Sequence, residues 1–344
     1  MPAGANAAPF LRDSVMHDVI LRVEDLRTHY LDKNTVIKAV DGVSFELRRG
    51  TTLGIVGESG CGKTTVGLSI LDIVPYPGRI VGGRIFYDGN EVTAMGGEEL
   101  RRLRGREISM IFQDPVAGLN PVLPIGIQVE ETITTHLSLP KKEARRMTLD
   151  ILRQLGLPHP ERLVQQYPFH LSGGMCQRVM IAIATVLSPK VIIADEPTSS
   201  LDVTVQAAIL EELNRLKRER EVSIILITHD LGVVAQMADE VAVMYAGRIV
   251  ESGQVRELFR QPRHPYTWAL LSALPRLDGG QGPLRSIKGS PPDLGELPPE
   301  CAFLPRCHKA VNACRQEPWP PLKELSPGHW AACFNPVYQE PERD

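Results

Sequence analysis

The segment that most constrains this chain is a glycine-rich loop between an apolar run and a sequence typical of a helix. The loop reads GESGCGKT from Gly57 to Thr64 and follows the apolar run LGIV. It fits the pattern G-x4-G-K-[ST], in which backbone N–H groups surround phosphates at a helix N-terminus. Lys63 is expected to reach the outer phosphates of a nucleotide, and the Thr64 hydroxyl to bind Mg²⁺. The residues expected to contact the nucleotide here are Gly57, Glu58, Ser59, Gly60, Cys61, Gly62, Lys63, Thr64 and Thr65.

Buried strands that alternate with helices are predicted around this loop. The runs Leu53–Val56, Val191–Ala194 and Ser223–Ile227 are short and apolar, and each ends at a polar or glycine-rich loop. That pattern is typical of parallel strands in an α/β fold, where ligands bind at the carboxyl ends of the strands. Residues 84–92 and 241–253 instead predict antiparallel hairpins, because each carries a turn dipeptide ending in glycine. Between about residues 114 and 170 the pattern becomes helical, which indicates an inserted helical subdomain.

A pair of carboxylates follows the second of these apolar runs. Asp195 ends the run and Glu196 comes next, before Pro197. Asp195 can hold Mg²⁺, and Glu196 can polarise the water that attacks a γ-phosphate. The alternative is that the pair only caps a following helix.

A second anion-binding segment precedes the apolar helix predicted at 179–187. A serine and two glycines at a helix start offer backbone N–H donors to an anion. One chain does not need two such cradles for one triphosphate, so we expect a dimer in which this segment covers the γ-phosphate held by the partner's loop. Its residues are Leu171, Ser172, Gly173, Gly174 and Gln177.

Together these motifs resemble the ATP-binding-cassette (ABC) ATPases. The resemblance implies an α/β fold: a P-loop ATPase domain with a RecA-like core, an antiparallel β subdomain and a helical subdomain. It also implies four further roles. Gln113 would be a Mg²⁺ ligand, Asp202 part of the D-loop, His229 the contact to the γ-phosphate, and Tyr30 the aromatic residue that stacks on adenine. Ser200 departs from the alanine that is usual in the D-loop.

Longer stretches resemble the ATPase subunits of the dipeptide/oligopeptide permease class, which nickel and some oligosaccharide importers share. These stretches are GIVGESGCGKT, MIFQDPVAGLNP, DEPTSSLDVTVQAAIL and HPYTWALLSALP. The class implies import of peptides driven by ATP hydrolysis. It implies as partners a second ATPase subunit in a heterodimer, two transmembrane permease subunits and an extracytoplasmic substrate-binding protein. A soluble ABC ATPase of DNA repair or ribosome recycling is the alternative, but such chains usually hold two cassettes or a long coiled-coil or zinc insertion.

Four cysteines lie close together near the C-terminus: Cys301, Cys307, Cys314 and Cys333. In a reducing compartment such a cluster indicates a metal centre more than disulfides. The spacing lacks the close Cys pair usual for zinc and so favours a [4Fe–4S] cluster, which the tails of similar permease subunits also carry. Structural zinc, with His308 or His329 able to replace a cysteine, and the absence of any metal are the alternatives.

Composition sets the remaining expectations. The formal net charge of −3 argues against binding to nucleic acid by bulk electrostatics. No apolar run is long enough for a bilayer span and the start lacks a secretory pattern, so we expect a cytosolic protein. The resemblance to permease ATPase subunits further implies that it works as a peripheral protein on the cytoplasmic face of the inner membrane. Residues 260–344 contain 15 of the 28 prolines. We therefore predict a flexible N-terminus at 1–17, an ATPase domain at 18–259 and a proline-rich module at 260–344 that binds the metal.

Overall fold

The computed structural model describes residues 18–32, 35–199, 201–273 and 287–338 of the chain. The predicted flexible N-terminus, residues 1–17, and Ser200 lie outside these residues. The chain divides into two compact units. The first takes the residues up to Glu46, Leu53–Thr93 and those from Thr228 onward, and the second takes Leu47–Thr52 and Ala94–Ile227.

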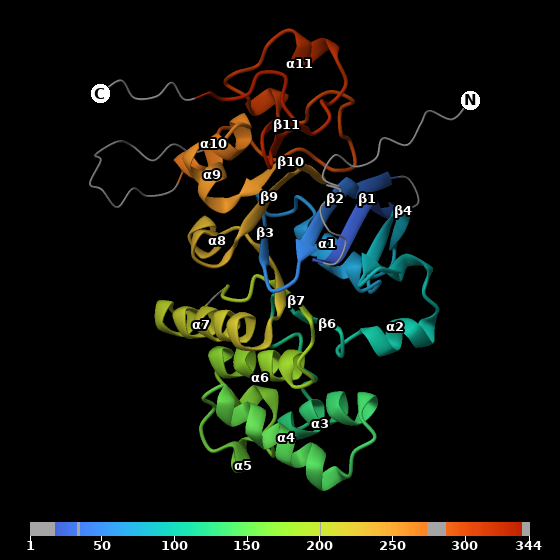
Figure 1. Ribbon diagram of the computed structural model, residues 1–344, viewed down its shortest axis with the longest axis vertical. Coiled ribbons are helices and arrows are strands. Elements are labelled where there is room, and N and C mark those ends of the chain that lie inside the picture. The colour runs from blue at the N-terminus through green and yellow to red at the C-terminus, as the bar shows by residue number, and fades with distance from the viewer. Residues whose placement is uncertain (1–17, 33–34, 200, 274–286, 339–344) are drawn as a thin grey trace. The chain divides into compact units, whose positions relative to one another are not determined.

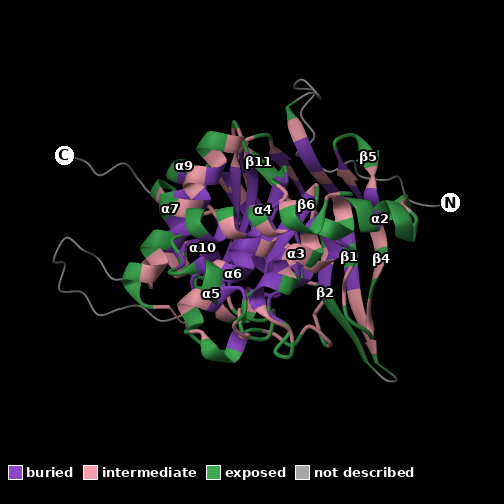
Figure 2. Ribbon diagram, turned by 90° about the horizontal axis from the view of Figure 1, so that it is seen from below, coloured by how far each residue is buried: buried purple, intermediate pink, exposed green. Residues whose placement is uncertain are grey.

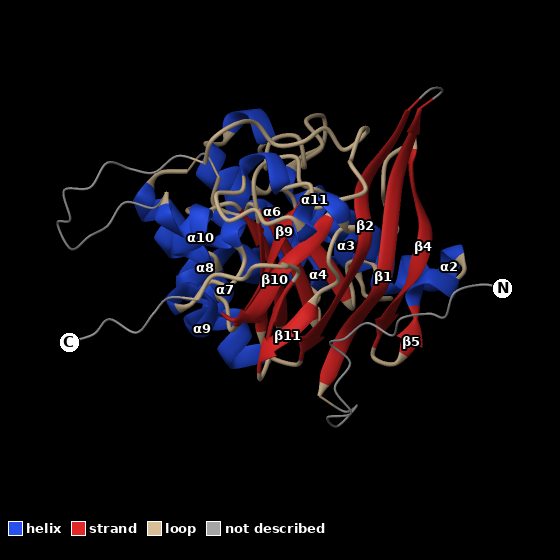
Figure 3. Ribbon diagram, turned by 90° about the horizontal axis from the view of Figure 1, so that it is seen from above, coloured by secondary structure: helices blue, strands red, loops and turns tan. Residues whose placement is uncertain are grey.

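An antiparallel sheet forms one part of the first unit, with its strands side by side in Figure 3. The hairpin predicted at 84–92 is confirmed, because Phe86 pairs with Glu91 across the turn. Asp88 and Gly89 both have positive φ, 47° and 80°, as a tight hairpin turn requires. In spatial order the strands are β2 (Thr35–Arg48), β1 (Val19–Asp32), β4 (Gly78–Tyr87) and β5 (Asn90–Glu91).

A second set of strands in this unit carries the glycine-rich loop. The loop leads from β3 (Thr52–Val56), which is parallel to β9 (Glu240–Tyr245), into α1 (Lys63–Ile70). The hairpin predicted at 241–253 is confirmed, since β9 pairs antiparallel with β10 (Arg248–Gln254). Helix α8 (Leu231–Met237) precedes β9, and α9 (Val255–Arg260) and α10 (Pro265–Ser272) follow β10.

Residues 287–338 are mostly loop and join this same set of strands. Their hairpin, β11 (Lys323–Ser326) and β12 (His329–Ala331), pairs with β10 through β12. Glu251 of β10 is completely buried and accepts hydrogen bonds from the backbone N–H groups of Arg263 and His264, at 2.6 and 2.8 Å. The ring of His329 lies 2.7 Å from the same carboxylate. A long-range hydrogen-bond cluster therefore attaches the proline-rich region to the sheet. Its remaining elements are η3 (Leu304–Arg306) and α11 (Ala313–Gln316).

The second unit contains three parallel strands and the helical region. All residues of the three strands are buried, as suits parallel strands whose runs are mostly apolar. Figure 2 shows that buried ribbons, drawn in purple, fill the interior of the protein. The strands are β6 (Ile108–Ile111), β7 (Val191–Asp195) and β8 (Ser223–Thr228), and neighbours pair in parallel register. The helices are α2 (Gly97–Leu103), α3 (Ile125–His136), α4 (Lys141–Gln154), α5 (Pro160–Leu163), α6 (Gly173–Thr185) and α7 (Val203–Arg220).

The predicted helical subdomain corresponds to α3, α4 and α5, which gather beside α6 in Figure 1. Helix α4 buries one face through Ala144, Thr148, Ile151 and Leu152 at helical spacing, as an amphipathic helix does. Among the described residues, no helix combines the length and apolarity that crossing a bilayer demands.

Candidate functional site

The glycine-rich loop needs glycine at two positions because other backbone approaches it closely. A Cβ atom at Gly57 would lie 2.2 Å from the carbonyl oxygen of Met244. At Gly62, where φ is 103°, a Cβ atom would lie 1.9 Å from the carbonyl oxygen of Ala39. Both distances are far inside van der Waals contact, so these glycines allow the loop to pass close to the backbone of β9 and β2.

The side chain of Lys63 contacts the backbone of the glycine-rich loop. Its side chain is buried, and its Nζ donates to the carbonyl oxygens of Gly57 and Glu58 at 2.7 and 3.0 Å. Thr64 is exposed at the start of α1, whereas Thr65 is buried. The ammonium group is therefore positioned beside the loop, where an anion can replace the carbonyl partners.

Glu58 is tied to the C-terminal part of the chain. Its backbone N–H donates to the hydroxyl of Tyr266 at 2.8 Å. Its carboxylate accepts two hydrogen bonds from Arg306, from Nη1 at 2.6 Å and from Nη2 at 2.8 Å. Sequence reasoning missed both partners, because they lie 208 and 248 residues away and no motif joins them to the loop.

Tyr30 and His229 also belong to the first unit. Tyr30 pairs with Gly78 in the antiparallel sheet, and a Cβ atom at Gly78 would lie 2.7 Å from its ring. Glycine at position 78 thus lets the Tyr30 ring pack against the neighbouring strand. His229 is exposed directly after β8, before Asp230, whose Oδ1 accepts from the backbone N–H of Gly232 and begins α8.

The second unit holds the two carboxylates. Asp195 is 1% exposed at the end of β7. Its Oδ1 is buried and accepts no hydrogen bond within the described residues, although the residue makes another interaction. A buried carboxylate oxygen of this kind fits a Mg²⁺ site, since hard cations prefer oxygen ligands. Glu196 has a positive φ of 47°, a conformation that costs energy for a residue with a Cβ.

The predicted anion-binding segment begins α6 as expected. Ser172 is the N-cap, and its Oγ accepts from the backbone N–H of Met175 at 3.4 Å. Ser172 and Gly173 are exposed, and Leu171 and Gly174 are partly exposed, so this helix start faces solvent. Gln177 is buried instead, and its Nε2 donates to the carbonyl oxygen of Pro197 at 2.9 Å. Gln177 therefore joins α6 to the segment that follows Glu196.

Gln113 and Asp202 lie on exposed segments of the same unit. The Oγ of Ser199 donates to the backbone oxygen of Gln113 at 3.4 Å, and Gln113 is exposed. Asp202 caps α7, accepting from the backbone N–H groups of Thr204 and Val205. The candidate residues are thus divided between the two units, each set formed at strand ends and helix starts.

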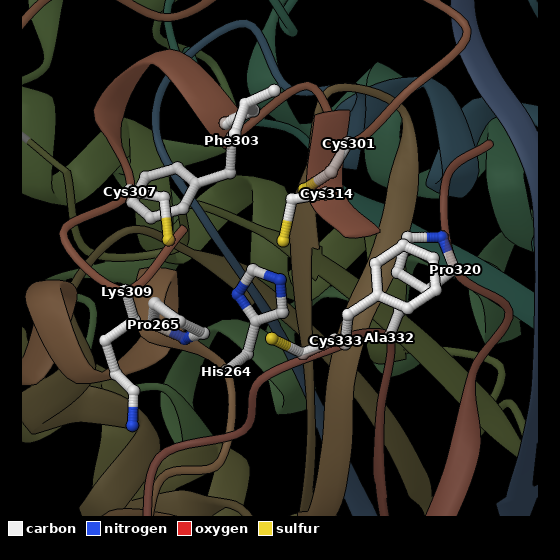
Figure 4. Close-up of a pocket in the computed structure, with 12 residues that line it drawn as sticks. His264, Pro265, Cys301, Phe303, Cys307, Lys309, Cys314, Pro320, Ala332 and Cys333 are labelled. Atoms are coloured by element: carbon white, nitrogen blue, oxygen red, sulfur yellow. The ribbon is translucent and has the colours of Figure 1, made fainter. Parts of the chain in front are cut away.

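The four clustered cysteines line one pocket in the first unit, around His264 in Figure 4. Burial raises the pKa of Cys301 to about 11 and that of Cys333 to about 12. Such thiols stay protonated at neutral pH unless a cation compensates the charge of the thiolate. Nowhere in the described parts of the chain do three or more His, Cys, Asp or Glu side chains adopt the geometry of a metal site. The pocket thus has the donor types for a metal without the arrangement of one.

Comparison with known proteins places these features in a family. The family model described as "ABC transporter" matches residues 40–199, and the model "Oligopeptide/dipeptide transporter, C-terminal region" matches residues 250–314. The chain is 47% identical to an oligopeptide transport ATP-binding protein of Salmonella typhimurium, covering 93% of this chain and 95% of that protein. It is 45% identical to a dipeptide transport ATP-binding protein of Bacillus subtilis, covering 92% and 94%.

A solved structure gives the same result for the fold. A dimeric ATP-binding cassette bound to ADP and phosphate matches with a TM-score of 0.63 at 26% identity, covering 69% of this chain and 99% of that one. The relatives extend over nearly the whole chain, whereas the cassette leaves part of it uncovered. The chain belongs to the ATP-binding proteins of the ABC transporter family, in the branch that carries the oligopeptide/dipeptide transporter C-terminal region.

Proposed function

We propose that this protein is the ATP-hydrolysing subunit that powers peptide import through a membrane ABC transporter. The observation that carries the proposal is the 47% identity to an oligopeptide transport ATP-binding protein over 95% of that protein's length. The match to the C-terminal region of oligopeptide/dipeptide transporters supports peptides over the nickel and oligosaccharide cargoes of the wider class.

Within this function each candidate residue has a role. The loop from Gly57 to Thr65 binds the phosphates, and Tyr30 stacks on the adenine. Mg²⁺, held by Thr64, Gln113 and Asp195, would neutralise the charge that develops on the β- and γ-phosphates. Glu196 accepts a proton from the attacking water, and His229 contacts the γ-phosphate.

The partners follow from the second anion-binding segment. Leu171, Ser172, Gly173, Gly174 and Gln177, with Asp202, would complete the site of a second ATPase subunit, and that subunit would complete the site of this chain. The exposed start of α6 supports this arrangement. We propose a heterodimer that docks on two transmembrane permease subunits at the cytoplasmic face of the inner membrane and is supplied by an extracytoplasmic substrate-binding protein.

The test is uptake by cells whose chromosomal copy of this gene is deleted. Labelled tripeptide, Ni²⁺ and an oligosaccharide are supplied separately, and the gene is returned as wild type or as Glu196→Gln. We expect the wild type to restore tripeptide uptake alone and the variant to restore none. Restored uptake of Ni²⁺ or of the oligosaccharide in place of the peptide would reassign the cargo. Unchanged uptake of all three after deletion would contradict the transport function.

We also propose that Cys301, Cys307, Cys314 and Cys333 hold a [4Fe–4S] cluster, with zinc as the alternative. The four thiols line one pocket, and burial of Cys301 and Cys333 raises their pKa and so disfavours their thiolates unless a bound cation compensates the charge. The cluster would serve as a staple or a redox sensor, because a loop-rich segment needs added cross-links.

Iron, acid-labile sulfide and zinc, measured per chain on protein purified without oxygen, test this. We expect about four irons and four sulfides, with both lost when Cys301 or Cys333 becomes serine. Stoichiometric zinc without sulfide would make the segment a zinc clip. Absence of both metals would leave four thiols and contradict the metal centre.

A further inference from the structure

Glu58 stands out because all three of its polar groups are engaged. Its backbone N–H is bonded to Tyr266, its carbonyl oxygen to Nζ of Lys63, and its carboxylate to Arg306. Two of the three partners come from beyond the cassette, from α10 and from η3 in the proline-rich region. A residue held at every polar group has little freedom to move, and neither has the loop on each side of it.

The contact between Arg306 and the Glu58 carboxylate has a geometry that fixes the position of the carboxylate. The guanidinium is 5% exposed and grips both oxygens of the Glu58 carboxylate, the geometry in which arginine fixes a carboxylate best. Its Nε donates to the carbonyl oxygen of Lys288 at 2.9 Å, and its Nη1 lies 3.3 Å from the Tyr245 hydroxyl. The other end of the ion pair is thus itself fixed.

A cluster of aromatic residues packs beside the Arg306 guanidinium and restricts its movement. The rings of Tyr245, Tyr266 and Phe303 pack against one another with centroids 4.5 to 5.3 Å apart. The guanidinium lies 5.9 Å from the centroids of both Tyr245 and Phe303. The cluster therefore supports Arg306 and the Tyr266 hydroxyl together, and through them both sides of Glu58.

We propose that Arg306 is a positioning residue for nucleotide binding: through Glu58 it holds the phosphate-binding loop in its binding shape. The carbonyl oxygen of Glu58 is one of the two that hold the ammonium of Lys63, so the orientation of Glu58 also sets the resting place of that ammonium. When Arg306 is absent, the Glu58 carboxylate turns to water and the loop must be ordered again each time a nucleotide binds. That ordering cost lowers affinity without changing any atom that touches the nucleotide.

The proposal rests on nucleotide binding at this loop and not on peptide import. The test measures the Kd of a fluorescent ATP analogue for the full-length purified chain. Arg306→Ala is expected to raise Kd about tenfold, the factor that loss of a charge-assisted hydrogen bond corresponds to. Arg306→Lys, which keeps the charge but not the two-point grip, is expected to recover part of the affinity. Arg315→Ala, which removes an exposed arginine of α11 in the same region, is the matched control and should leave Kd unchanged.

A double-mutant cycle distinguishes the positioning of Glu58 by Arg306 from a role of Arg306 in stabilising the proline-rich region alone. In a Glu58→Ala background, Arg306→Ala should raise Kd no further, because the residue acts through Glu58. A role confined to stapling the C-terminal region would lower the thermal midpoint of the Arg306 variant and leave its Kd at the wild-type value, which would overturn the proposal. Should Arg306→Ala not fold, Glu58→Ala removes the same contact from the other side, and a wild-type Kd there would overturn it equally.

A further control separates this proposal from the nucleotide-binding function itself. Wild type should bind the analogue and Lys63→Ala should not. Failure of the wild type to bind would contradict nucleotide binding. Binding by wild type together with equal binding by Arg306→Ala would contradict only the positioning role.

Discussion

At the scale of single residues, the nucleotide-binding loop depends on glycines at positions where a residue with a side chain would not fit. Gly62 combines a positive φ with a carbonyl oxygen placed where its Cβ would be. Glu196 is the opposite case, because it adopts a left-handed backbone conformation although it has a side chain. Sequence patterns point to both positions, but only the structure reveals the close contact at the first and the strain at the second.

Gly62→Ala should abolish ATP binding, because the new methyl group and the Ala39 carbonyl oxygen cannot both keep their places. Equilibrium binding of a fluorescent ATP analogue measures the effect. Gly60→Ala is the matched control: φ there is also positive, 79°, but nothing lies within 4 Å of the new Cβ. In that variant only the left-handed conformation of alanine is unfavourable, by about 1 kcal/mol, so it should still bind ATP. Equal affinities for the two variants would show that the close contact is unimportant.

Glu196→Gln should keep ATP binding and slow turnover by about 10²–10⁴-fold, the usual effect of losing a general base. The amide preserves size and hydrogen bonding but cannot accept the proton of the attacking water. Phosphate release by the assembled transporter and nucleotide binding are measured side by side. Turnover at the wild-type rate would remove Glu196 from the chemistry.

At the scale of elements, what could be predicted was local. The buried runs of β3, β7 and β8 and the glycine-containing turns after Tyr87 and Tyr245 are encoded within a few residues, so sequence alone indicated them correctly. The pairing of β12 with β10 was not foreseen, because only tertiary contacts specify it. Arg306 and Tyr266 were missed for the same reason. Their contacts with Glu58 join residues 248 and 208 positions apart, and no sequence pattern indicates such contacts.

An ion pair between β2 and β10 should make stability depend on pH. Asp41 is bonded to Nη2 of Arg248 at 2.7 Å, with His29 3.9 Å away. Burial acts to raise the pKa of Asp41, but Arg248, aided by Lys38 and Arg27, outweighs it and brings that pKa below 3.8. The carboxylate therefore contributes stability above the ordinary pKa of 3.8, and this contribution is lost as pH falls through the lower folded value.

Arg248→Met should lower the thermal midpoint at pH 7, and the difference from wild type should shrink as pH falls below about 4. Without its partner the buried carboxyl group would have a raised pKa, and at low pH both proteins carry it protonated. Thermal unfolding at several pH values measures this. Arg84→Met, which removes an exposed ion pair to Glu24 in the same antiparallel sheet, should change the midpoint little at any pH. A constant difference for Arg248→Met across the range would contradict the titration.

At the scale of the whole molecule, the residues proposed to bind ATP and Mg²⁺ are divided between the two compact units, while the four cysteines proposed to hold the [4Fe–4S] cluster lie in the first. The proline-rich region shares that unit with the phosphate-binding loop. Its separation as a module beginning at residue 260 stays a prediction, because the structure gives it a hairpin paired to β10 and a buried cluster around Glu251. Composition indicated that the region would be rich in loops but could not indicate what those loops touch.

The β11–β12 hairpin also determines how the sheet ends. A strand without a neighbour on one side presents unpaired backbone groups to other chains, and natural proteins protect such edges with short, charged strands. Strand β11 has four residues, and its Lys323 and Glu324 are exposed. Deleting the residues after Gly279 would uncover β10, so we expect the shortened chain to self-associate in sedimentation, unlike full-length protein with serine at Cys301. A monomeric shortened chain would contradict this. We therefore expect the hairpin to protect the edge of β10 from pairing with strands of other chains, a role separate from nucleotide binding and from the cysteines.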